Sequence, residues 1–143
     1  MLDAKFFRRV GPNTRDRYRK HIFQDAKDVY DKPFKQYTSK QYAERKRANK
    51  FKRQSSQYSN SLAPVLTSDL LRDFSLIKTS SGGFQLGFTT FGARVQHLKK
   101  MGRVLSDTNQ PLPDGVIKYL SKESRLYINK KLPKGKKTYR IGK

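Results

Sequence analysis

The chain has 143 residues, with 33 lysines and arginines against 11 aspartates and glutamates, so its net charge is +22. The absence of cysteine excludes disulfides, thiolate metal sites and a cysteine nucleophile, and no apolar run is long enough to span a membrane. With 34% hydrophobic residues and a mean hydropathy of −0.90, the chain predicts one domain, residues 1–143, with a small core.

The charge is concentrated at the two ends of the chain. Residues 1–60 and 121–143 are strongly basic, whereas the segment between them is nearly balanced and carries most of the apolar pattern. Because a large single-sign charge repels itself in a compact fold, this distribution is typical of a protein that binds a polyanion or an acidic protein surface.

The N-terminal region is predicted to hold a basic helix. Asn13 or Thr14 can cap this helix, which runs to about residues 23–26 with Tyr18 on its apolar face. The pair at positions 11 and 12, a glycine and a proline, is expected to separate the helix from a short lead.

A turn and a short helix are expected next. Pro33 disfavours a helix at the residue before it, so residues 28–34 are predicted to form a turn and an extended entry. Ser39 can then cap a helix over residues 40–47. Residues 48–61 show neither helical nor strand periodicity, and they predict a mobile basic loop.

The middle of the chain predicts a β-hairpin. Thr67 or Ser68 can cap a turn of helix, after which residues 74–79 and 84–90 alternate apolar and polar side chains around a Ser-Ser-Gly-Gly turn. Three residues of the second strand are expected on one face: Phe84, Leu86 and Phe88. In the first strand, the alternation places Lys78 on the same face as Phe74 and Leu76.

Two further helices are predicted. The first spans residues 92–101, directs Val95, Leu98 and Met101 inward, and ends at Gly102. Asp114 is expected to cap the second, over residues 114–131. Its predicted apolar side is made of Val116, Ile117, Leu120, Ser124, Tyr127, Ile128 and Lys131.

Together these elements predict an α+β fold. A small antiparallel sheet, the hairpin 74–79/84–90, packs against the N-terminal, middle (92–101) and C-terminal (114–131) helices. Pro133 ends the last helix, and residues 134–143 form a basic tail.

The sequence contains no catalytic constellation, and we predict no enzyme activity, cofactor or metal site. His97 has no carboxylate at a helical spacing, which favours a structural or partly exposed side chain. Asp69 and Asp73 lie one turn apart near a predicted helix start, where the helix dipole accounts for them. The glycines at 82, 83 and 87 lack the Lys-Ser/Thr that follows a phosphate loop.

The candidate functional residues are basic side chains with interspersed aromatics. They are typical of sequence-independent contacts to phosphates or to acidic protein surfaces, although a run of charge is more often only a solvated face. The candidates are Arg45, Lys46, Arg47, Lys50, Lys52, Arg53, Lys134, Lys136, Lys137 and Arg140.

The order of several short motifs resembles that of virion-morphogenesis and tail-completion proteins of tailed bacteriophages, which form the neck or head–tail connector. After a basic N-terminal helix come Lys-Pro-Phe-Lys-Gln-Tyr-Thr at 32–38 and Pro-Val-Leu-Thr-Ser-Asp-Leu-Leu-Arg-Asp-Phe at 64–74. A hairpin, Val-Gln-His-Leu at 95–98 and Pro-Leu-Pro at 111–113 then precede the C-terminal helix.

The resemblance implies a structural subunit. It implies an α+β protein that forms a homo-oligomeric ring in the virion, after assembly in the host cytoplasm, and joins the DNA-filled head to the tail. Implied partners are neighbouring portal-side and tail proteins and packaged DNA, with no membrane. The alternative is a basic RNA-scaffolding protein such as a ribosomal component, which the charge and the basic ends also fit.

Overall fold

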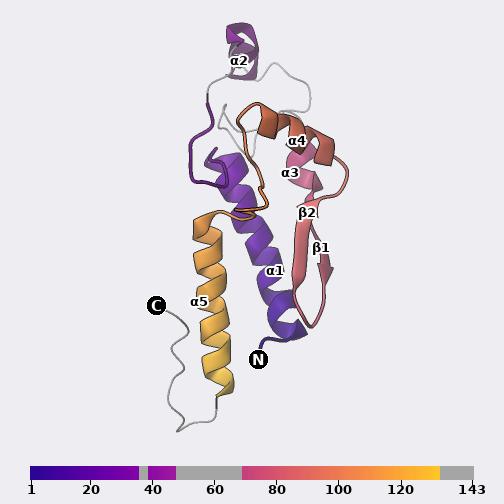
Figure 1. Cartoon of the computed structure of the whole chain (residues 1–143), viewed down its shortest axis with the longest axis vertical. Coiled ribbons are helices and arrows are strands. Elements are labelled where there is room, and N and C mark those ends of the chain that lie inside the picture. Colours follow the sequence, from indigo (N-terminus) through magenta and orange to yellow (C-terminus); the bar gives the residue numbers. More distant parts are fainter. Residues whose placement is uncertain (36–38, 48–68, 133–143) are drawn as a thin grey trace.

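A computed structural model describes residues 1–35, 39–47 and 69–132 of the chain. In this part the fold is α+β, as the sequence predicts, with helices and one two-stranded antiparallel sheet (Figure 1). The elements are α1 (Ala4–Arg19), continued by the π-helical turn η1 (Lys20–Gln24), α2 (Lys40–Arg47), α3 (Asp69–Asp73), β1 (Phe74–Thr79), β2 (Phe84–Phe88), α4 (Gly92–Lys100) and α5 (Asp114–Lys131).

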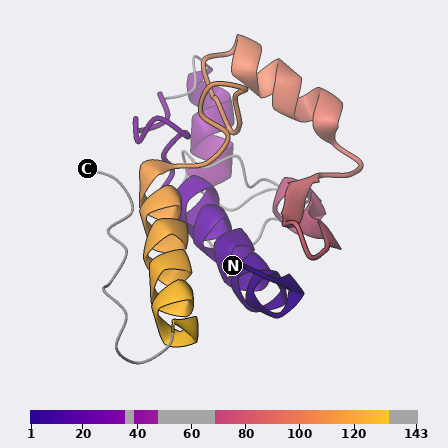
Figure 2. The same cartoon turned by 60° about the horizontal axis from the view of Figure 1, so that its bottom comes forward.

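Helix α1 is the axis of the molecule. The hairpin β1–β2 packs on one flank of α1, and α5 packs on another (Figures 1 and 2). Helix α5 runs antiparallel to α1, while α3 and α4 gather near the C-terminal end of α1 and α2 lies beyond that end. Thus α1 is the element that both the sheet and the last helix use to bury their apolar faces.

Helix α1 starts ten residues earlier than the sequence predicts, so the assignment of Asn13 or Thr14 as its cap is wrong. The N-cap is Asp3, whose carboxylate accepts the backbone N–H of Phe6 at 3.0 Å. Pro12 lies inside the helix, where it removes a hydrogen bond and costs about 3 kcal/mol in an isolated helix. Burial of Phe6 and Val10 between the flanking elements offsets this cost.

Gly11 does not break α1 but permits close packing. A Cβ at this position would lie 3.1 Å from Cδ1 of Leu76 in β1, closer than side chains ordinarily approach. The glycine therefore marks the point where helix and hairpin meet most closely, a role that local sequence rules do not predict.

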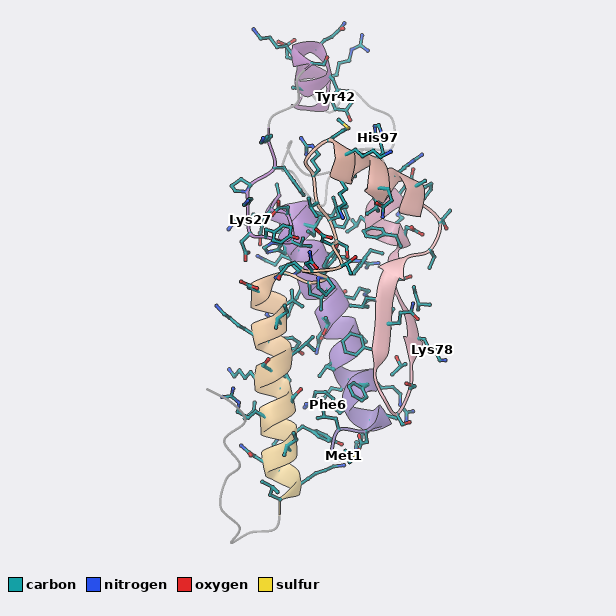
Figure 3. All side chains as sticks on the ribbon, in the orientation of Figure 1. Met1, Phe6, Lys27, Tyr42, Lys78 and His97 are labelled. Carbon is teal, nitrogen blue, oxygen red and sulfur yellow. The ribbon has the colours of Figure 1, made fainter. Side chains whose placement is uncertain are left out.

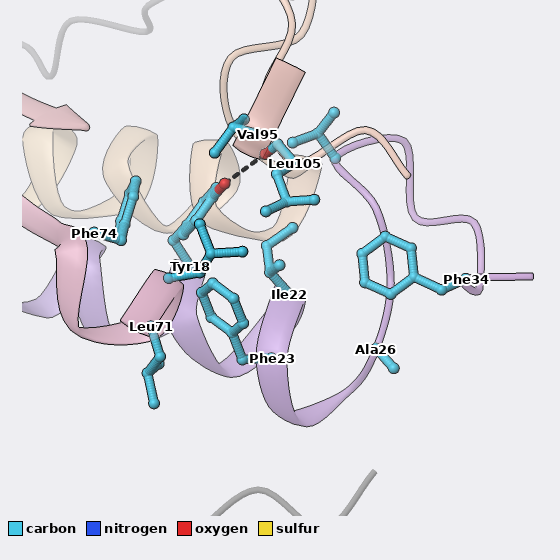
Figure 4. Close-up of a cluster of buried hydrophobic side chains, with 11 residues drawn as sticks. Tyr18, Ile22, Phe23, Ala26, Phe34, Leu71, Phe74, Val95 and Leu105 are labelled. Atoms are coloured by element: carbon cyan, nitrogen blue, oxygen red, sulfur yellow. Dashed lines mark hydrogen bonds between the residues drawn. The ribbon is translucent and has the colours of Figure 1, made fainter. Parts of the chain in front are cut away.

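The main core surrounds the C-terminal half of α1 (Figure 4). The ring of Tyr18 stacks on Phe74 of β1 with centroids 3.9 Å apart, and its hydroxyl donates to the backbone carbonyl of Leu105. Ile22 and Phe23 are fully buried beside it. The predicted apolar face of this helix, with Tyr18 at its centre, is confirmed.

The hairpin is confirmed, and its register explains one error in the sequence analysis. Phe74 pairs with Phe88 and Leu76 with Leu86, but a bulge at Ile77 shifts the strand by one residue. Lys78 consequently pairs with Gln85 and is exposed, away from the face of Phe74 and Leu76 where the alternation places it (Figure 3).

Phe84, Leu86 and Phe88 lie on the face toward α1, as predicted. Phe84 contacts the ring of Phe7 with centroids 6.3 Å apart, while Leu86 and Phe88 pack against the core. Strand β2 ends at Phe88, two residues before the predicted end.

The predicted turn at 28–34 and the predicted helix at 40–47 are both present. The carboxylate of Asp28 accepts the backbone N–H groups of Tyr30 and Lys32, each at 2.9 Å, which closes the turn. The Ser39 hydroxyl accepts the N–H of Tyr42 at 3.2 Å at the start of α2.

Helices α4 and α5 match their predicted ranges within one residue, but three details are wrong. Met101 is 54% exposed, because α4 ends at Lys100 and turns away through Gly102 at a φ of 78°. Ile117 is 40% exposed, although Val116 next to it is buried. Asp114 is the first residue of α5 and makes no cap hydrogen bond, since Pro113 occupies the cap position.

Candidate electrostatic interface

The structure places three of the predicted contact residues in one element. Arg45, Lys46 and Arg47 belong to the last turn of α2, and Arg45 is exposed. The other candidates lie outside the described residues: Lys50, Lys52, Arg53, Lys134, Lys136, Lys137 and Arg140. The predicted basic loop at 48–61 and the basic tail at 134–143 also fall outside them.

All 11 acidic residues lie in the described part of the chain, and nearly all of them hold the fold together. Only Glu44 in α2 has neither an ion pair nor a side-chain hydrogen bond within the described ranges. The ion pairs join Arg9 to Glu123 at 3.1 Å, Arg15 to Asp16 at 2.9 Å, Lys20 to Asp25 at 3.2 Å, Arg94 to Asp69 at 3.6 Å, Lys99 to Asp107 at 3.0 Å, and Lys131 to Asp3, while Nε2 of His21 lies 3.5 Å from the carboxylate of Asp31.

Asp73 is the clearest example of an acid that serves the fold. Its buried carboxylate accepts the Thr89 hydroxyl at 2.7 Å and the backbone N–H groups of Thr90 and Phe91 at 2.8 and 2.9 Å. Burial raises the pKa of this carboxyl, but the hydrogen bonds from Phe91, Thr89 and Thr90 outweigh that effect and lower it to about 2. Asp73 thus ties α3 to the segment that enters α4.

Asp3 plays a similar part where the N-terminus of α1 meets the C-terminus of α5. Besides capping α1, its carboxylate accepts the Tyr127 hydroxyl at 2.9 Å and pairs with the Lys131 ammonium. The hydrogen bond from Lys131, followed by those from Phe6 and Tyr127, holds the pKa of Asp3 well below its ordinary value.

An open groove between α1 and α5 carries both signs of charge. Arg9, Arg17 and Lys20 line one side, but Arg9 pairs with Glu123 and Lys20 pairs with Asp25. The Arg17 guanidinium lies 4.1 Å from the centre of the Tyr119 ring. Two of the three cations in this groove already pair with carboxylates, and Asp16 and Glu123 also line it, which makes it a poor anion site.

The outer face of α5 is different. Lys118, Lys122 and Arg125 are exposed, and no acidic side chain of the described residues pairs with any of them. Their spacing of four and three residues places them in one stripe, about 10 Å long at 1.5 Å per residue. Ile117 and Leu126, 40% and 46% exposed, lie on either side of this stripe.

We call these five residues the α5 outer face. Like charges at these spacings destabilise a helix by about 0.2–0.5 kcal/mol per pair. The stripe is therefore a cost to the isolated helix. The signal for this stripe in the sequence is the spacing of its basic residues by three and four positions, which a pattern of consecutive charges does not reveal.

No group of acidic or histidine side chains in the described ranges is arranged to hold a metal ion. His97 is exposed on α4, as the sequence predicts (Figure 3). None of the described helices is both long and apolar enough to cross a bilayer.

Comparison of the chain with protein-family models, with curated protein sequences and with solved structures finds no match.

Proposed function

We propose that this protein is a non-catalytic structural subunit of a bacteriophage neck or tail-completion ring. In this role it joins the DNA-filled head to the tail through sequence-independent electrostatic contacts. Its partners are other copies of itself, acidic surfaces of neighbouring portal-side or tail proteins, and packaged DNA.

The observation that carries the proposal is the way the charge is used. The 33 basic side chains outnumber the acidic ones threefold, and all of the acids except Glu44 already take part in ion pairs or hydrogen bonds within the described residues. The excess of positive charge therefore has no internal counterion. A polyanion or an acidic protein surface supplies one, and an assembly subunit beside packaged DNA meets both.

The motif order described above supports the choice of a phage neck among such assemblies. The α+β fold is compatible with that role, because a hairpin and helices on a central helix give a small subunit with several free faces.

The first test is the state of the purified protein. We expect the chain, freed of nucleic acid by nuclease and high salt, to form a ring of uniform mass in light scattering and electron microscopy. Co-purification with ribosomal RNA, with no ring after its removal, would favour the RNA-scaffolding alternative.

A second test concerns the basic tail. Non-specific binding to duplex DNA weakens with salt at a log–log slope of about −0.9 per phosphate neutralised. We expect serine at Lys134, Lys136, Lys137 and Arg140 to reduce this slope without any change in sequence preference. If DNA binding is absent at low salt, the same variant should instead block the joining of heads to tails.

A further inference from the structure

We propose that the α5 outer face is a docking site for an acidic, amphipathic segment of a different protein. The inference deepens the proposed function, on which it rests, by assigning one partner contact to five named residues: Ile117, Lys118, Lys122, Arg125 and Leu126.

The first argument is charge complementarity. Lys118, Lys122 and Arg125 form a continuous cationic stripe with no acidic partner in the described part of the fold. A helix or strand with carboxylates at a matching spacing can pair with all three at once. Arginine and lysine in such a stripe fix the register of a partner as well as attracting it.

The second argument is the presence of apolar side chains beside the stripe. Ile117 and Leu126 are 40% and 46% exposed and line the same open depression as the three cations. A phosphate backbone buries little apolar surface, whereas a protein segment with leucine-like side chains beside its carboxylates covers both residues. The composition of the face thus favours an acidic protein over nucleic acid.

A second copy of this chain is a poor source of the carboxylates. All 11 acidic residues lie in the described ranges, and only Glu44 there is without an ion pair or side-chain hydrogen bond. One glutamate cannot match three cations in a row. A second copy would have to give up ion pairs or hydrogen bonds of its own to match the stripe, whereas a different protein with unpaired carboxylates would not, and this favours a different protein as the occupant.

The inner side of α5 leaves the outer face available. Val116 is buried against the fold, and Tyr127 contacts Phe6 of α1 with ring centroids 5.1 Å apart. Because α1 covers only this inner side, a partner can approach α5 from the outside without displacing any element that the structure describes (Figures 1 and 2).

The test measures binding of two synthetic peptides to the full chain by fluorescence anisotropy. The first peptide is an amphipathic helix with glutamates at positions i, i+4 and i+7 flanked by leucines. The second has the same glutamates, but serine replaces each leucine. We expect the first to bind several-fold more tightly than the second, since only the first covers Ile117 and Leu126.

Three variants locate the binding. The triple variant Lys118→Gln, Lys122→Gln, Arg125→Gln should weaken binding of the leucine peptide about tenfold. The double variant Ile117→Ser, Leu126→Ser should remove the preference for the leucine peptide. The charge-matched control replaces exposed cations elsewhere, Lys32→Gln, Lys78→Gln and Lys100→Gln, and should change the affinity less than about twofold. Far-UV circular dichroism confirms that each variant is folded.

Three results would overturn the proposal. The first is absence of binding by the unsubstituted chain, and the second is an equal loss in the face variant and the control. The third is duplex DNA binding that falls in the α5 triple variant while the leucine and serine peptides bind alike, which would make the face a nucleic-acid contact. Ring formation is measured separately, so loss of the ring with peptide binding intact would reject the proposed function and leave the docking site standing.

Discussion

Helices α1 and α5 lie side by side but differ in how much of their surface is covered and in how their cations are paired. Helix α1 is covered on two flanks. Arg9 and Arg15 of this helix, and Lys20 directly after it, each have an acidic partner. Helix α5 is covered on one side, and the cations of its outer face have no acidic partner within the described ranges. The difference lies in where the few acids are placed: several pair with cations on or next to α1, and none in the described ranges pairs with the cations of the α5 outer face.

The largest effect should come from the buried side of α1. Tyr18→Ala removes a ring that stacks on Phe74 and should lower the free energy of unfolding by about 3–5 kcal/mol. Tyr18→Phe should cost only about 1 kcal/mol, for the lost hydrogen bond to Leu105. Leu126→Ala on α5 is the matched control and should stay within about 0.5 kcal/mol. Urea unfolding measures the free energy for all three variants. A loss of several kcal/mol in Leu126→Ala would show that the outer side of α5 is as important for stability as the buried side of α1.

The next comparison uses one glycine from each helix. Gly11→Val forces a side chain against Leu76 and should destabilise the protein by about 1–3 kcal/mol. Gly115→Ala, where a Cβ meets nothing within 4 Å, should stabilise it by up to about 1 kcal/mol through helix propensity. The midpoint temperature of thermal unfolding should therefore fall in Gly11→Val and rise in Gly115→Ala. Shifts of the same sign would contradict the packing described for α1.

Asp73 tests whether the acids secure the fold. Asp73→Ala leaves the N–H groups of Thr90 and Phe91 without their acceptor and should cost about 1–3 kcal/mol. Because the pKa of Asp73 falls from 3.8 to about 2 on folding, its contribution is complete above about pH 4 and is lost as the pH drops toward 2. The variant should accordingly show a flatter fall in stability over that interval than the unsubstituted chain. Urea unfolding at pH 4 and pH 2 measures this fall. If the free energy of unfolding drops equally in the variant and in the unsubstituted chain, another carboxyl is responsible.

The smallest effect should come from the stripe on α5. Lys122→Glu turns the two repulsive pairs that Lys122 makes with Lys118 and Arg125 into attractive ones. This change should stabilise the isolated protein by about 0.2–0.5 kcal/mol per pair. The same change should abolish binding of the leucine peptide. A higher free energy of unfolding together with lost peptide binding would show that the stripe serves binding and not stability. A lower free energy of unfolding would mean that the stripe stabilises the fold.

The sequence predicts the regular elements well, because their periodicity is local. The hairpin, the short helix after Ser39 and the long helix from Asp114 all depend on patterns that a window of a few residues contains. The start of α1 could not be predicted from such a local pattern. The rules for glycine and proline at positions 11 and 12 describe an isolated helix, and tertiary burial overrides them here.

The remaining errors have similar causes. The bulge at Ile77 shifts the pairing by one residue, so a strict two-residue alternation misplaces Lys78. The sequence analysis sought the candidate site in runs of basic residues. The α5 outer face was missed because its cations are spaced by three and four residues and only a helix brings them together.

The contacts of Asp3 have a consequence for the order in which the protein folds. Asp3 meets Tyr127 and Lys131 across 124 and 128 positions of the chain, whereas the hairpin joins strands that are nearly adjacent. Closing so long a loop is slow, so we expect the hairpin to form early and α5 to dock late. During synthesis α1 emerges before α5, the helix that covers Phe6. We expect a ribosome-bound nascent chain that ends before α5 to expose the apolar flank of α1, and limited proteolysis of such a chain would show this exposure.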